Sequence, residues 1–217
     1  MPKEITGRAL AGLFLITMLV VGTGTTAYAI TFGPNCGSGN CFGSIYTLTT
    51  SLFSSTATTQ TYNATLAVNT AGYNGSGTGL DAAAVKIVAP SNFISATSFT
   101  LPATFGSPIA TGINASGCAG GGGGFVCTSS SNTDGVTVPN GTYTFGFRTT
   151  IKTGTLLGEN QWSVKALYVD STGKQAGITS VSGGGAVPVP GTAVLFGVGF
   201  AMFVAWHQRS RRIDSLC

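Results

Sequence analysis

The sequence predicts an all-β protein. We expect an antiparallel β-sandwich, immunoglobulin-like or jelly-roll-like, between an N-terminal signal peptide and a single C-terminal transmembrane helix. Short segments alternate bulky apolar with polar residues at a period of two, as half-buried strands do. Clusters of Gly, Asn, Ser and Pro separate these segments, and the middle of the chain has no convincing helical pattern. Each end of the chain carries an apolar run next to basic residues.

The N-terminal segment has the order of a secretory signal peptide. Basic residues near its start are followed by an apolar region over 9–21. Ala27 and Ala29 then frame a small-x-small cleavage site. Residues 1–29 are therefore the first predicted unit, and the mature protein is expected to begin near Ile30.

Residues 30–185 are the second predicted unit, which is enough chain for one exported domain. Its predicted strands are 44–49, 61–68, 82–88, 95–101, 142–150 and 162–169. The run 142–150 alternates most clearly, so it is expected to be a central strand. The stretch 103–138 is expected to be a long irregular connection, and 162–169 is the last strand predicted.

Four cysteines lie in this domain, and exported chains usually oxidise such cysteines to disulfides. Four cysteines allow three connectivities. The simplest pairs close neighbours, Cys36 with Cys41 and Cys118 with Cys127, and this is the pairing we predict. The spacing does not fit paired zinc knuckles, and the single histidine, His207, lies beyond the C-terminal apolar run. No metal or cofactor is therefore expected.

The C-terminal segment, residues 186–217, is the third predicted unit, and it has three parts in order. The first is the motif of Val187, Pro188, Val189 and Pro190. An apolar run over about 191–206 follows, and Arg209, Arg211 and Arg212 form a basic cluster within 209–212. At about 1.5 Å per residue the run is roughly 24 Å long, somewhat short of a hydrocarbon core of about 30 Å. The order predicts a marginal transmembrane helix whose basic end stays in the cytoplasm.

This order of Val-Pro-x-Pro motif, short apolar helix and arginine cluster resembles the PEP-CTERM protein-sorting signal of Gram-negative bacteria. Val189 stands where the usual motif of that family has glutamate, so the tail is nearer to the related Val-Pro-Leu-Pro type. The resemblance implies processing by an exosortase-like membrane enzyme. It also implies an exported protein that is first held in the inner membrane and then reaches the cell envelope, the outer surface or the extracellular matrix.

Composition excludes several function classes. The chain is only 7% charged, and its formal net charge of +4 comes largely from the two ends. The middle part is close to neutral, which gives no basic face for a nucleic acid. Three of its four acids lie beside Gly or turn residues, where acids usually form solvated turns. The four acids are Asp81, Asp134, Glu159 and Asp170. No catalytic constellation is present, so the protein is not expected to be an enzyme.

Two function classes remain. The first is a structural protein of the cell surface or of an exopolysaccharide or biofilm matrix. The alternative is an adhesin that resembles a carbohydrate-binding module, is anchored by the C-terminal helix and presents aromatics such as Tyr73, Trp162 or Tyr168 to an extracellular polysaccharide. Trp162 lies on an alternating strand, where an aromatic side chain is more often part of the core. Exposure of these aromatics would favour the sugar binder, and their burial beneath a Thr/Ser surface would favour the structural protein.

Overall fold

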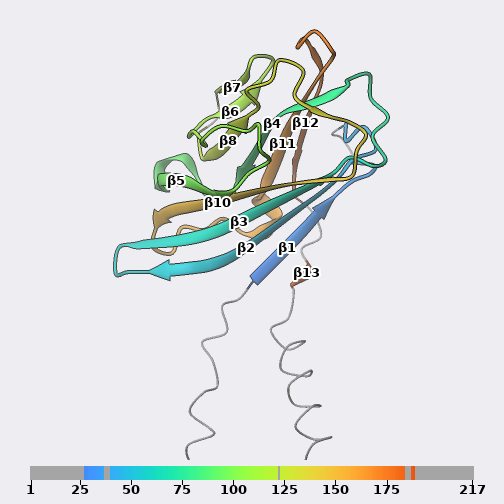
Figure 1. Ribbon diagram of the computed structural model, residues 1–217. Helices are drawn as coiled ribbons and strands as arrows, with labels where there is room; N and C mark the ends of the chain where they lie inside the picture. Colours follow the sequence, from blue (N-terminus) through green and yellow to red (C-terminus); the bar gives the residue numbers. More distant parts are fainter. Residues whose placement is uncertain (1–26, 37–39, 122, 184–186, 189–217) are drawn as a thin grey trace, which may run out of the picture.

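The alternating segments form the long strands of two antiparallel sheets in a computed structural model (Figure 1). The structure describes residues 27–36, 40–121, 123–183 and 187–188. Within these ranges the only helical segments are two 3-10 turns, η1 (Pro90–Asn92) and η2 (Glu159–Gln161). The prediction of an all-β, antiparallel protein is therefore confirmed.

The first sheet has six strands in the order β13-β1-β2-β3-β10-β5. Their bounds are β13 (Val187–Pro188), β1 (Ala27–Phe32), β2 (Ile45–Ser55), β3 (Thr59–Asn69), β10 (Thr142–Lys152) and β5 (Phe93–Thr100). Strand β10 lies between β3 and β5, so its predicted central position is confirmed. On β2 and β3 the buried pairs Tyr46–Val68 and Leu48–Leu66 alternate with half-buried neighbours, as the period of two predicts.

The second sheet has five strands, in the order β12-β11-β4-β8 with β9 also paired to β4. Their bounds are β12 (Gln175–Ser182), β11 (Ser163–Val169), β4 (Gly79–Lys86), β8 (Phe125–Ser129) and β9 (Val136–Thr137). A small hairpin of β6 (Gly112–Asn114) and β7 (Gly117–Gly120) is not hydrogen-bonded into either sheet but packs against β4, β8 and β11 of the second one. Figure 1 shows β4, β11 and β12 running in a clearly different direction from β2, β3 and β10.

One hydrophobic core is built from the inward side chains of both sheets. The six-stranded sheet contributes Leu48, Leu66 and Phe145, which are fully buried. The five-stranded sheet contributes Val85 of β4, which is buried. Trp162, the residue just before β11, is buried in the same core. A smaller cluster, which includes Leu167 and Cys127, fills the other side of the second sheet. Burial of apolar area on both faces of β4 and β11 explains why these strands are almost continuously apolar.

Two sequence-based expectations are wrong. The stretch 103–138 is not an irregular connection, because it contains β6, β7, β8 and β9. The segment 162–169 is not the last strand, because β12 follows it as the partner of β11. The turn between β11 and β12 is held by Asp170, whose Oδ1 accepts hydrogen bonds from the backbone of Thr172 and Lys174. The Thr172 hydroxyl also donates to this oxygen. The three hydrogen bonds stabilise the ionised carboxylate and so lower the pKa of Asp170, and the bond from the Thr172 hydroxyl contributes most.

The predicted signal peptide before Ala27 and the predicted transmembrane helix over 191–206 lie outside the described residues. Among the residues that are described, no helix has the length and apolar character needed to cross a membrane.

Candidate functional site

The start of the predicted sorting motif lies at an edge of the six-stranded sheet. Val187 and Pro188 form β13, which pairs with β1 so that Tyr28 lies opposite Pro188 and Ala29 opposite Val187. Figure 1 shows β13 beside the beginning of β1. The remaining residues of the sorting prediction lie outside the described ranges: Val189, Pro190, Arg209, Arg211 and Arg212. Their role stays a prediction.

The predicted cleavage site lies in β1, where Ala27 pairs with Ser51 and Ala29 with Thr49. Ala27 and Ala29 are half-buried, whereas Ile30 is 1% exposed and Phe32 is buried. Cleavage after Ala29 would leave Ile30 and Phe32 in the mature protein. It would remove Tyr28, whose ring packs edge-on against Trp162, and with it both β1 residues that pair with β13. The structure does not test this cleavage site, which stays a prediction.

Both predicted disulfides are present. Cys36 and Cys41 are joined across a Cα–Cα distance of 5.4 Å, and Cys118 and Cys127 across 5.7 Å. The first closes the loop between β1 and β2, and the second ties β7 to β8. Each bond joins cysteines that are close in sequence, as predicted, so each fixes a local loop.

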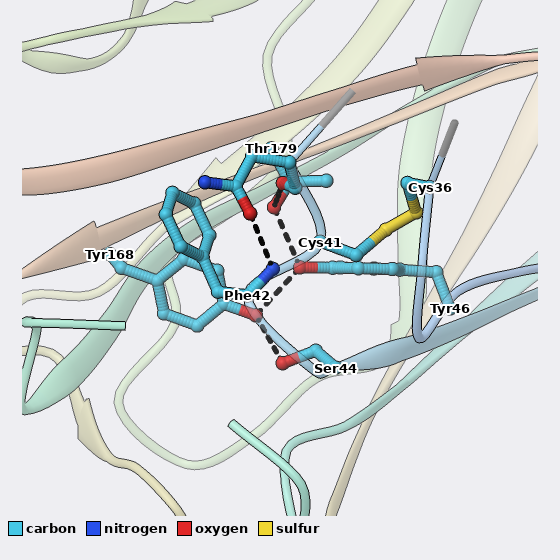
Figure 2. Close-up of a disulfide and its surroundings, with 8 residues drawn as sticks. Cys36, Cys41, Phe42, Ser44, Tyr46, Tyr168 and Thr179 are labelled. Atoms are coloured by element: carbon cyan, nitrogen blue, oxygen red, sulfur yellow. Dashed lines mark hydrogen bonds between the residues drawn. A yellow bond between two sulfur atoms is a disulfide. The ribbon is translucent and has the colours of Figure 1, made fainter. Parts of the chain in front are cut away.

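A buried hydroxyl network joins the two sheets beside the first disulfide. The Tyr46 hydroxyl lies 2.7 Å from the Tyr168 hydroxyl and 2.9 Å from Thr179 Oγ1. Tyr168 also donates to Ser44 Oγ, and Thr179 donates to the Asn40 carbonyl. Figure 2 shows these side chains converging next to the Cys36–Cys41 bond. The network therefore connects β2, β11 and β12 with the disulfide loop.

Burial controls the chemistry of this network. Desolvation raises the pKa of both Tyr46 and Tyr168 above the usual tyrosine value of 10.0, because the anionic form is penalised in the core. Both hydroxyls therefore stay protonated at neutral pH. A protonated, solvent-inaccessible tyrosine pair cannot serve as a base or nucleophile there, so its contribution is to the fold.

The three aromatics of the sugar-binding alternative are in the core. Trp162 and Tyr168 are 0% exposed and Tyr73 is 7% exposed. Trp162 Nε1 donates to the Leu157 carbonyl at 2.8 Å, and the Tyr73 and Tyr168 rings stack with centroids 4.4 Å apart. None of the three can present its ring to a sugar, so the expectation that such aromatics belong to the core is confirmed.

Two polar hollows lie at the surface. One, of about 440 Å³, lies beside the first disulfide and is lined by residues such as Asn35, Asn40 and Asn74. The other, of about 250 Å³, is lined by Asp81 together with Ser130 and other polar residues. Burial raises the pKa of Asp81. Within the described ranges no three or more His, Cys, Asp and Glu residues gather where they could hold a metal ion.

A more organised arrangement lies on the outer face of the six-stranded sheet. We call Phe53, Asn63, Phe99 and Arg148 the outer-face cluster. The Arg148 Cζ atom lies 3.7 Å from the centre of the Phe53 ring and 5.9 Å from that of Phe99, and its Nε donates to Asn63 Oδ1 at 3.1 Å. The two rings are 53% and 46% exposed. The cluster thus crosses four neighbouring strands and holds a cation between two accessible aromatic rings.

Local backbone irregularities position both rings. The pairing of β2 with β3 shifts register between Leu52 and Ser54, which leaves Phe53 as the extra residue. On β5 the pairing skips Phe99 in the same way. Such bulges redirect a side chain without ending the strand. Gly146 completes the arrangement, because a Cβ at this position would come within 2.6 Å of the Phe99 ring.

Sequence reasoning did not identify this cluster. Its one signal is Arg148, the only charged residue within the predicted strand 142–150. The two phenylalanines carry no comparable signal, because an alternating strand pattern does not reveal a register shift.

Comparison of the chain with protein-family models, with curated proteins and with solved structures gives no match.

Proposed function

We propose that this is an exported structural protein of the cell surface or extracellular matrix, without catalytic activity, sorted through its C-terminal tail by an exosortase-like system. Its two sheets act as a β-sandwich. The observation that carries the proposal is the pair of local disulfides in a domain of very low charge. Disulfides form and persist in oxidising compartments outside the cytosol.

The distribution of side chains supports a structural role. The largest buried side chains include Trp162, Tyr46 and Tyr168, while the outward positions of β2, β3 and β10 are mainly Thr, Ser and Asn. A surface of hydroxyls and amides stays hydrated and carries little net charge, which suits a protein packed in a matrix. Burial of these aromatics also removes the residues on which the adhesin alternative rested.

The tail supports the sorting part of the proposal through its order alone. The motif Val187 to Pro190, the apolar run 191–206 and the arginine cluster follow one another as in a stop-transfer segment with a processing motif. In this proposal the membrane holds the chain until the processing enzyme acts near Pro190.

Surface labelling tests the proposal. Intact producing cells are treated with an amine reagent that does not cross membranes, and the labelled lysines are mapped by peptide mass spectrometry. We expect label on Lys152 and Lys174, which are exposed on the folded domain. Replacing Arg209, Arg211 and Arg212 with Gln should shift the protein from the envelope to other fractions, because the basic stop is lost.

Replacing Asp214 with Asn, in the same tail, is the matched control and should leave fractionation unchanged. Label that appears only after cell lysis would contradict a location at the cell surface. Unchanged fractionation of the arginine variant would contradict sorting by the tail.

A further inference from the structure

The six-stranded sheet presents a face with hydrogen-bonding groups and almost no charge. Its strands β1, β2, β3, β5 and β10 contain no Asp or Glu, and Arg148 and Lys152 are their only charged residues. Threonine hydroxyls are paired across neighbouring strands, Thr31 with Thr47 at 3.3 Å and Thr61 with Thr150 at 3.1 Å. The face therefore offers hydroxyl groups, one central cation and no repulsive carboxylate.

Arg148 is held ready for an anion. Stacking on Phe53 and the hydrogen bond from Nε to Asn63 fix the plane of its guanidinium group. In the described part of the chain this bond is the one hydrogen bond that the guanidinium makes, and an arginine has five N–H donors. The remaining donors match the two oxygens of a carboxylate in a bidentate pair.

The two phenylalanines define the rest of the site. Each exposes about half of its side chain, which is costly for a large apolar residue unless something covers it. The rings come from β2 and β5, which lie on opposite sides of β10 in the strand order. The apolar C–H faces of sugar rings pack on exposed aromatic rings, and the flanking Thr and Ser hydroxyls can bond to sugar hydroxyls.

We propose that the outer-face cluster binds an acidic polysaccharide, with a uronic acid carboxylate on Arg148 and neighbouring sugar rings on Phe53 and Phe99. Charge complementarity selects this occupant: a nucleic acid needs a clustered basic face, which one arginine and one lysine do not provide. This inference extends the proposed function, on which it rests, by naming the matrix component that the protein contacts.

Binding is measured on the oxidised protein as purified from the producing cells, by titration with polygalacturonate at low salt. We expect saturable binding that weakens about tenfold in Arg148→Gln, because the bidentate pair is lost. Phe53→Ser and Phe99→Ser should each weaken binding more than a substitution at an exposed residue outside the cluster. Methyl-esterified polygalacturonate, which keeps the sugar rings but has no carboxylate, should bind at least as weakly as the Arg148 variant binds the acid form.

Lys152→Gln is the matched control, since it removes one positive charge from the same strand outside the cluster. It should weaken binding less than twofold. Equal losses in the Arg148 and Lys152 variants would overturn the proposal in favour of non-specific electrostatic attraction. Equal binding of neutral dextran would also overturn it, because dextran has no carboxylate for Arg148. The face would instead belong to a second copy of the chain if two results came together. The protein would not bind polygalacturonate, and it would form a dimer that the phenylalanine variants abolish.

This assay does not depend on export. If the protein does not bind polygalacturonate but Lys152 and Lys174 are labelled on intact cells, the proposed ligand is wrong and the proposed function stands. If the protein binds polygalacturonate but is labelled only after lysis, the ligand stands and the proposed location at the cell surface is wrong.

Discussion

At the scale of single residues, the Tyr46 hydroxyl explains how a polar group is kept in this core. A buried hydroxyl without a partner costs about 1–3 kcal/mol. Tyr46 avoids this cost because the hydroxyls of Tyr168 and Thr179 both lie within 2.9 Å of its own. The same contacts join β2 to the opposite sheet, so loss of one hydroxyl removes a hydrogen bond between the two sheets.

We predict that Tyr168→Phe lowers the free energy of unfolding by about 1–3 kcal/mol at pH 8, because Ser44 and Tyr46 lose a partner. Burial raises the pKa of Tyr168 and Tyr46 in the folded protein, so the unfolded chain releases these protons first as the pH rises above 10.0. Stability should therefore fall above pH 10, and less steeply in the Phe variant.

Urea denaturation at pH 8 and pH 10.5 measures both effects. Tyr143→Phe is the control: its hydroxyl donates to the Thr137 carbonyl at the exposed surface, so its loss should lower the free energy of unfolding at pH 8 by less than Tyr168→Phe does. An alkaline loss that is as steep in Tyr168→Phe as in the wild type would show that this hydroxyl does not contribute to it.

At the scale of elements, the sequence predicted the strands in which long alternation is visible. β2, β3 and β10 extend the predicted segments by a few residues, because pairing with neighbours continues beyond the apolar pattern. β6, β7 and β9 were missed because each is only two to four residues long and they are rich in glycine or lie near turns. β12 was missed because its polar residues outnumber the apolar ones that face the core.

The disulfides act at the same scale. Breaking Cys118–Cys127, by changing both residues to Ala, should lower the free energy of unfolding by about 2–3 kcal/mol, because a loop with a sequence separation of 9 is released in the unfolded chain. The comparable change at Cys36 and Cys41 should cost about 2 kcal/mol, because that separation is only 5.

Thermal or urea unfolding of the two double variants measures these differences. Alkylation of the unfolded, unreduced wild type is the companion measurement and should leave all four cysteines unmodified. Labelling of two cysteines would contradict this account. A smaller loss of unfolding free energy in the Cys118 and Cys127 variant than in the Cys36 and Cys41 variant would contradict it as well.

At the scale of the whole molecule, the candidate site could not be predicted from the sequence because it is assembled across strands. Phe53 and Arg148 are 95 positions apart and meet only because β3 places β2 and β10 on its two sides. The pairing of β2 with β3 also shifts register beside Phe53, which no composition or period reveals. The predicted sorting motif, by contrast, is continuous in sequence, and the role proposed for it depends on processing of the chain rather than on its fold.

The central claim, an exported and oxidised domain released from its tail, is tested most directly by the intact mass of the protein from the envelope and from the medium, without reduction. We predict a mass that runs from Ile30 to a terminus near Pro190 and corresponds to two disulfides. A mass that starts at Met1 or runs through Cys217, or one that corresponds to four free thiols, would contradict the account.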